Sequence, residues 1–146
     1  MPQIAGLQAI EWKEAITTGI DVIDNEHHYL LEILQEINEK LLVDDSDLLL
    51  EQAIKNLLCY ALMHFETEEA LMQRYSYAAA YPDEAQDHII QHRKFSHRIV
   101  TVHDQLREGQ KISRIEIVGF LNNWLQDHVF DRDKSLCIFL VQKMGK

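Results

Sequence analysis

The chain has 146 residues, of which 47% are apolar and 26% charged, the balance of one globular domain with a sizeable core. A formal net charge of −10 argues against a nucleic-acid partner, and no run of about 18 apolar residues occurs that could span a membrane. The N-terminus has no basic region followed by an apolar core. We therefore expect a cytoplasmic protein, with Cys59 and Cys137 as reduced, packed thiols.

Four helical segments follow one another along the chain. Only five Gly and two Pro residues occur, which favours long helices and few turns. Apolar residues recur in alternating steps of four and three, the pattern of an inner helix face in a bundle. We predict helices over residues 22–42, 47–75, 82–108 and 113–141.

Local signals support two of these boundaries. Pro82 suits the first position of a helix, and Ser113 with Glu116 has the spacing of a capping box. Four helices with short connections predict an all-α, up-down-up-down antiparallel four-helix bundle. We expect residues 1–146 to form this one domain, with an extended N-terminal arm whose Trp12 packs on the bundle.

Polar residues interrupt the apolar stripes, and all of them fall toward the same end of the predicted bundle. They are His27 on the first helix, His64 and Glu68 on the second, His88 and His92 on the third, and His128 on the fourth. Buried charges are normally paired or bound to a metal. Five imidazoles and a carboxylate in one buried layer therefore predict a metal site.

A further ligand follows from the spacing of the last helix. Asp133 lies five residues after His128, which on a regular α-helix is about 140° out of phase. Leu136 and Leu140 nevertheless continue in steps of three and four from Asp133, so the apolar stripe resumes with Asp133 on it. A single π-bulge between His128 and Asp133 would absorb the offset, and such bulges are frequent at functional sites.

Several other polar residues lie off these stripes. His28 is turned about 100° from His27 along the helix, so we expect it to face solvent. Glu66 and Glu69 are expected on a solvated face. His97 and His103 fall outside the level of the predicted metal layer.

Four sequence pieces together resemble the hemerythrin family in its bacterial single-domain form. They are GIDVIDNEH at residues 19–27, HFETEEALM at 64–72, HIIQH at 88–92 and WLQDHVFDRD at 124–133. Each piece alone is weakly specific, but all four in this order are highly specific. The resemblance extends over nearly the whole chain, from residues 10–12 to about residue 140.

The resemblance implies a non-haem di-iron site with an oxo or hydroxo bridge between the two Fe ions. One iron would be held by His88, His92 and His128, and the other by His27 and His64, with one position open for O₂. Glu68 and Asp133 would bridge the two irons. In the family, residues equivalent to Phe65, Trp124, Leu125 and Val129 help to line the oxygen pocket.

The chain also departs from the family pattern. The connection between Glu68 and His88 is longer than usual, and we expect the extra residues, 76–81, to form a loop or an extension of the second helix. A Tyr often found shortly after the bridging Asp is absent, since Lys134, Ser135 and Leu136 follow Asp133.

Three classes of function fit such a centre. The first is an O₂ carrier, store or sensor without net turnover, served by a reductase or a signalling partner and in the sensor case belonging to a larger signalling protein. The second is a di-iron redox enzyme, such as a peroxidase, an oxidase or a nitric oxide reductase. The third is iron storage or a structural metal. We expect the first, because no spare acid–base residue lies on the inner stripes.

Overall fold

The computed structural model describes residues 17–43 and 47–145, and these residues form long helices with short connections. The expected N-terminal arm, Trp12 included, lies outside the described residues. In chain order the elements are α2 (Asp21–Val43), α3 (Asp47–Arg74), α4 (Tyr77–Ala80), α5 (Pro82–Arg107), α6 (Arg114–Asp127), the π-helix η1 (His128–Asp133) and α7 (Lys134–Met144).

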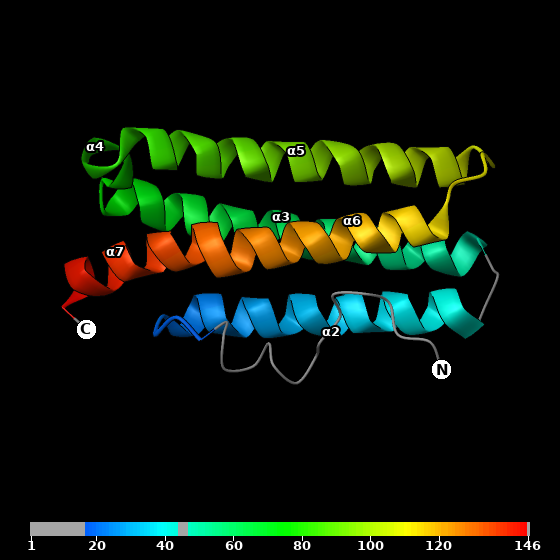
Figure 1. The fold of residues 1–146 in the computed structure, drawn as a ribbon, viewed down its shortest axis with the longest axis horizontal. Helices are drawn as coiled ribbons and strands as arrows, with labels where there is room; N and C mark the ends of the chain where they lie inside the picture. Colours follow the sequence, from blue (N-terminus) through cyan, green and yellow to red (C-terminus); the bar gives the residue numbers. More distant parts are fainter. Residues whose placement is uncertain (1–16, 44–46, 146) are drawn as a thin grey trace.

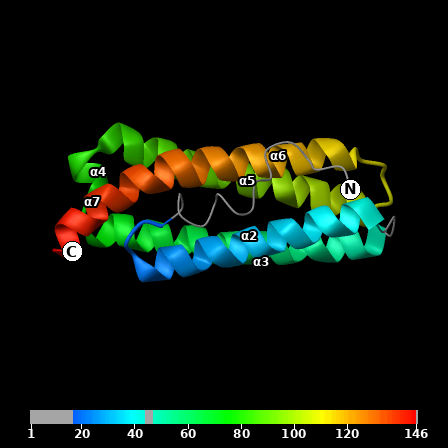
Figure 2. The ribbon, with the colours of Figure 1, turned by 60° about the horizontal axis from the view of Figure 1, so that its bottom comes forward.

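These elements form a four-helix bundle whose members alternate in direction. Figure 1 shows α2, α3 and α5 lying along the long axis, with α6, η1 and α7 joined into one continuous fourth rod. A turned view in Figure 2 shows the same side-by-side arrangement. The predicted all-α, up-down-up-down bundle is therefore confirmed. Within the described residues, no helix is both long and apolar enough to cross a membrane.

Hydrogen bonds to side chains define two of the helix starts. The Asp24 carboxylate accepts hydrogen bonds from the backbone N–H and the hydroxyl of Thr18, both within 2.8 Å, which fixes the entry into α2. Ser113 is the N-cap of α6, and its hydroxyl oxygen accepts from the backbone N–H of Glu116. This bond is the half of the predicted capping box in which the N-cap side chain satisfies a free helix N–H.

The longer connection between α3 and α5 differs from the expectation of a loop or a longer α3. Ser76 adopts a left-handed conformation with φ of 59°, which ends the path of α3 and starts the separate one-turn helix α4. Tyr77 is buried there and packs its ring against Phe139 at 5.1 Å and Tyr81 at 5.8 Å. Aromatic burial therefore holds the extra residues against α7, after which Pro82 begins α5 as predicted.

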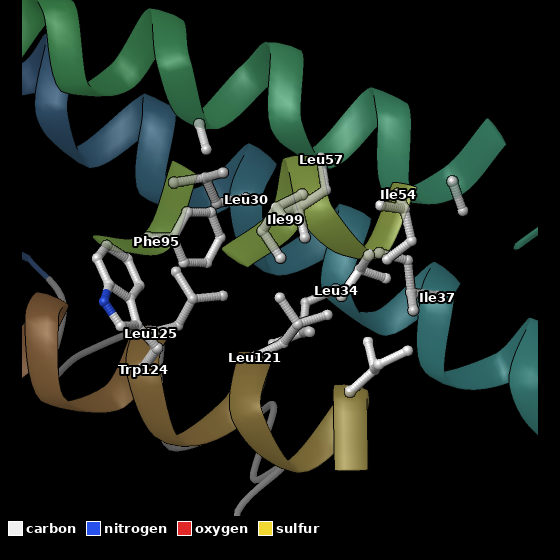
Figure 3. Close-up of a cluster of buried hydrophobic side chains, with 14 of the residues drawn as sticks. Leu30, Leu34, Ile37, Ile54, Leu57, Phe95, Ile99, Leu121, Trp124 and Leu125 are labelled. Carbon is white, nitrogen blue, oxygen red and sulfur yellow. The ribbon is translucent and has the colours of Figure 1, made fainter. Parts of the chain in front are cut away.

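The buried apolar residues of the described part of the chain form two clusters. Figure 3 shows the larger one, in which α2, α3, α5 and α6 contribute inward-pointing side chains such as Leu34, Leu57, Phe95 and Leu121. The smaller cluster includes Ile23, Met72, Ala85, Leu136, Leu140 and Tyr77. On each of the four rods the two clusters are separated along the chain by buried His, Glu or Asp residues. A polar layer therefore crosses the bundle between two apolar blocks.

Candidate metal centre

All four rods send polar side chains into this layer, and the seven residues described next are each at most 1% exposed. The structure brings all seven of the predicted ligands together: His27 from α2, His64 and Glu68 from α3, His88 and His92 from α5, and His128 and Asp133 from η1. The apolar stripes account for this meeting, because each of these residues takes a core position one turn away from a buried apolar residue.

The donor atoms of these side chains form two overlapping groups. In one, those of Glu68, His88, His92, His128 and Asp133 all lie within 4.8 Å of one another. In the other, the same holds for His27, His64, Glu68 and Asp133. Each group could hold a metal ion, and the two groups share both carboxylates. The donor atoms could thus hold two adjacent cations, with Glu68 and Asp133 within reach of both.

The five imidazoles all direct Nε2 toward the two carboxylates. Nε2 of His27 lies 2.8 Å from Oδ2 of Asp133, and Nε2 of His128 lies 2.8 Å from Oδ1 of the same residue. Nε2 of His92 is 3.0 Å from Oε1 of Glu68 and only 3.1 Å from Nε2 of His128. Nitrogen atoms that converge so closely suit ligands around a shared cation better than a network of ordinary hydrogen bonds.

The π-helix explains how His128 and Asp133 reach the same layer. The structure places η1 at His128–Asp133, so the bulge predicted from the five-residue spacing is confirmed. A π-turn accommodates one more residue than an α-turn, which brings residues i and i+5 onto one face. Both side chains are buried as a result, and Leu136 and Leu140 continue the apolar face beyond them.

Two further carboxylates hold imidazoles from outside the layer. Nδ1 of His64 lies 2.7 Å from Oε1 of Glu26, whose other oxygen accepts from the Thr67 hydroxyl at 2.8 Å. Nδ1 of His92 lies 2.8 Å from Oε2 of Glu69. Such partners keep the proton on Nδ1, so that Nε2 is free to bind a metal.

Sequence reasoning missed Glu26 and misplaced Glu69. The expectation of a solvated Glu69 is wrong, because its side chain is only 24% exposed and its carboxylate contacts His92 and Arg93. Each of these glutamates is the direct neighbour of a predicted ligand, and the rotation of about 100° per residue turns it toward an adjacent helix instead of toward water. Adjacency to a ligand was the signal that could have indicated both.

The electrostatics of the side chains alone favour an ionised layer. Burial lowers the pKa of His64, but the nearby carboxylates, Glu68 foremost, outweigh burial and raise this pKa to about 10. The same opposition raises the pKa of His88 to about 9. Burial acts to raise the pKa of Glu68 and Asp133, yet the surrounding imidazoles hold both pKa values below the usual range. Both carboxylates therefore carry negative charge at neutral pH, ready to face a cation.

A buried side-chain oxygen without a hydrogen-bond partner helps to decide whether a metal ion would fit between these residues. Oε2 of Glu68 is buried without a hydrogen-bond partner among the described residues. Leaving a carboxylate oxygen unpaired in a protein interior is costly, whereas a cation satisfies it directly. Imidazole and carboxylate are ligands that suit divalent iron, and zinc and manganese also accept them. The residues present thus fit a pair of divalent transition-metal ions.

Aromatic and aliphatic side chains cover the side of the layer that faces the larger apolar cluster. The Phe65 ring stacks on His92 with centroids 4.0 Å apart, and the Trp124 ring stacks on His128 at 4.5 Å. Leu125 and Val129 are buried in the same cluster. All four residues that sequence analysis assigned to an oxygen pocket lie here, so this side of the layer is apolar.

The remaining histidines and the thiols lie away from the two donor groups. His28, which was expected to face solvent, is partly buried, and His97 is exposed. His103 pairs with Glu51 at 3.5 Å, well along the bundle. Both cysteines are free, but Cys59 is exposed and only Cys137 is packed as expected.

The chain is similar in sequence to a known family and to several known proteins. The family described as the hemerythrin HHE cation binding domain matches residues 18–137. A bacteriohemerythrin of Pseudomonas aeruginosa is 28% identical over 122 residues, which are 84% of this chain and 75% of that protein. A bacteriohemerythrin of Clostridium acetobutylicum is 27% identical over 129 residues, covering 85% of this chain and 95% of that protein.

A solved structure agrees at the level of the fold. A crystal structure of wild-type hemerythrin superposes with a TM-score of 0.75, over 84% of this chain and 90% of that chain, at 20% sequence identity. The family match spans most of the chain and includes all the residues of the polar layer. The chain therefore belongs to the hemerythrin HHE cation-binding family.

Proposed function

We propose that this protein binds O₂ reversibly at a non-haem di-iron centre and acts as an oxygen carrier, store or sensor. The observation that carries the proposal is the pair of overlapping donor groups that share Glu68 and Asp133. Apart from the shared carboxylates, one group has three imidazoles and the other has two. The proposed assignment follows this asymmetry, and the iron with fewer protein ligands would have a coordination position left for O₂.

In the proposed assignment His88, His92 and His128 would hold one iron, and His27 and His64 would hold the second. Glu68 and Asp133 would contact both irons, and the family resemblance implies an additional oxo or hydroxo bridge. When bound and reduced, such an iron pair would supply the electrons for reversible O₂ binding. The chain's own part is to hold the imidazoles with Nε2 inward, and Glu26 and Glu69 support two of them.

Reversible O₂ binding would depend on keeping water and protons away from the metal centre. Phe65 and Trp124 stack directly on two of the proposed ligands, and Leu125 and Val129 close the same side. An apolar wall of this kind excludes water from a reactive centre, so we expect it to slow irreversible oxidation. We propose that these four side chains line the oxygen pocket.

We also propose that residues 1–146 form a single domain of this kind.

An absorbance cycle tests the proposal on reduced protein of known iron content. We expect two irons per chain and a visible charge-transfer band that appears with O₂ and disappears when the solution is deoxygenated, over repeated cycles. Direct conversion to an oxidised spectrum that does not reverse, with continued consumption of O₂ and a reductant, would contradict reversible binding. That outcome would place the protein among the di-iron redox enzymes instead.

A further inference from the structure

We propose that Arg132 is a positioning residue, which fixes the π-helical turn that presents His128 and Asp133 to the metal layer. The inference rests on the proposed ligand set, because it concerns how two of those ligands are held. Arg132 lies within η1, and its side chain is 26% exposed. It contacts one carboxylate on its own rod and one on α5.

The first contact is specific to the π-helical register. Nη1 of Arg132 donates to Oδ2 of Asp127, which lies five residues earlier. On a regular α-helix two such residues point about 140° apart, whereas a π-turn brings them onto one face. The Asp127–Arg132 pair therefore has the same i, i+5 spacing as His128 and Asp133 and is offset from it by a single residue. This ion pair forms only when the turn is π-helical, so it stabilises the π-helical turn relative to an α-helical one.

The second contact ties this turn to the neighbouring helix. Nε of Arg132 donates to Oδ2 of Asp87 on α5 at 2.8 Å. One guanidinium thus links two carboxylates from two rods. Each charged residue directly precedes a proposed ligand in the chain: Asp87 precedes His88, Asp127 precedes His128 and Arg132 precedes Asp133.

The three proposed ligands that follow Asp87, Asp127 and Arg132 in the chain come together at one oxygen atom, Oδ1 of Asp133. Oδ1 of Asp133 lies 3.2 Å from Nε2 of His88 and 2.8 Å from Nε2 of His128. A small rotation of η1 relative to α5 would separate Oδ1 of Asp133 from Nε2 of His88, since these two atoms are carried by different rods. Arg132 also lines a cavity of about 230 Å³ that reaches His88. Loss of its side chain would therefore both loosen the register and widen the approach from solvent.

A purely stabilising surface ion pair is the competing explanation. The side chains of Asp87 and Asp127 are 49% and 54% exposed, and ion pairs with such exposure add little to global stability. The two explanations therefore predict different results. Positioning predicts a change in metal retention and in the metal's spectrum, with little change in the unfolding temperature of the metal-free protein. A surface pair without a positioning role predicts no change in retention.

The experiment compares variants of the full chain by the rate at which the loaded protein releases iron to a chelator. We expect Arg132→Ala to release iron about tenfold faster than the wild type. Arg132→Lys keeps the charge but lacks the fork that pairs two carboxylates at once, so an intermediate rate is expected. Asp127→Asn removes the pair within the π-turn and should also release iron faster than the wild type. The absorption spectrum of the cobalt-loaded protein should change in the same order.

An exposed arginine on a different rod, Arg98 of α5, provides a matched control. Arg98 is exposed, with its guanidinium 5.3 Å from the centre of the Phe120 ring, and Arg98→Ala should release iron at the wild-type rate. If Arg132→Ala matches Arg98→Ala in release rate and spectrum, the inference is overturned while the proposed ligand set stands. If Arg132→Ala does not fold, wild-type release rates in both Arg132→Lys and Asp127→Asn overturn it equally. A wild-type protein that retains no metal would overturn the ligand set and this inference together.

Discussion

His64 and Glu68 lie four residues apart on α3 and are almost completely buried, at 1% and 0% exposure. Apolar neighbours cannot compensate for the cost of removing a charge from water. Both belong to the groups of donor atoms that could hold a metal, and Glu68 belongs to both groups. A pair of bridged cations would account for the burial of these two residues on an otherwise apolar face.

Glu68→Ala removes one of the two proposed bridges. We expect the variant to retain fewer than two irons per chain and to lose the O₂-dependent absorbance band, because each iron loses an oxygen ligand. Iron analysis after gel filtration measures this directly. Glu66→Ala is the matched control, since Glu66 is exposed on the same helix and should leave both irons in place. Two irons with an unchanged spectrum in Glu68→Ala would rule out the bridging assignment.

Glu26→Ala tests the support given to His64 from outside the layer. Nδ1 of His64 loses its partner at 2.7 Å, so the imidazole is free to rotate or to change its tautomer. Loss of such partners typically weakens metal binding by about 10- to 100-fold. Competition with a chelator measures the change. Thr67→Val, which leaves the His64–Glu26 contact intact, should have a smaller effect, and equal effects of the two changes would count against this role.

Whether an individual site residue could be predicted from the sequence depended on whether it lies on the apolar stripe of its helix. Inner-stripe periodicity identified His27, His88 and His92, because a buried polar residue on an apolar stripe stands out in one sequence. Glu26 and Glu69 lie off the stripes, so their contacts depend on which neighbouring helix is within reach. That relation comes from packing and is invisible in the periodicity of one helix.

At the scale of elements, η1 is the departure from regular structure that completes the layer. The five-residue step and the resumption of the apolar stripe at Leu136 were sufficient to predict it. The short helix α4 was not predictable in the same way. Its position depends on the left-handed Ser76 and on the packing of Tyr77 against Phe139, which lies far along the chain.

Deleting one residue should have different effects within the π-turn and elsewhere in the fourth rod. Removing the exposed Asp131 should convert η1 to a regular α-turn, in which the two ligands stand at i, i+4 on one face. We expect helical content and the unfolding temperature to be nearly unchanged. Removing the exposed Asn123 from α6 should instead rotate the part of the rod that follows by about 100° and destroy cooperative folding. Circular dichroism during heating measures helical content and the unfolding temperature of both variants. An equal loss of stability in the two variants would contradict the prediction that η1 can absorb a one-residue deletion.

At the scale of the whole molecule, a polar layer divides the apolar interior into two clusters. The sequence predicted this arrangement well, because four stripes with polar residues at matching heights allow few other packings. The layer is also the part of the interior that apolar contacts stabilise least. Bound metal should therefore contribute to the stability of the entire bundle.

Removal of metal is expected to lower the unfolding temperature. A ligand that binds only the folded state adds about 2.7 kcal/mol at a concentration of 100 times its dissociation constant. Calorimetry of the loaded protein, with and without a chelator, measures the shift, and adding iron back to the reduced protein should reverse it. An unfolding temperature that does not respond to the chelator, in protein shown to lose its iron, would mean that the metal does not stabilise the bundle.

The most direct test of the account is a crystal structure of the purified protein with anomalous data collected at the iron absorption edge. We predict two anomalous peaks about 3.5 Å apart. They should lie between the imidazoles of α2, α3, α5 and η1, with Glu68 and Asp133 in contact with both peaks. A single peak, or peaks outside this layer, would contradict a di-iron centre bridged by these two carboxylates.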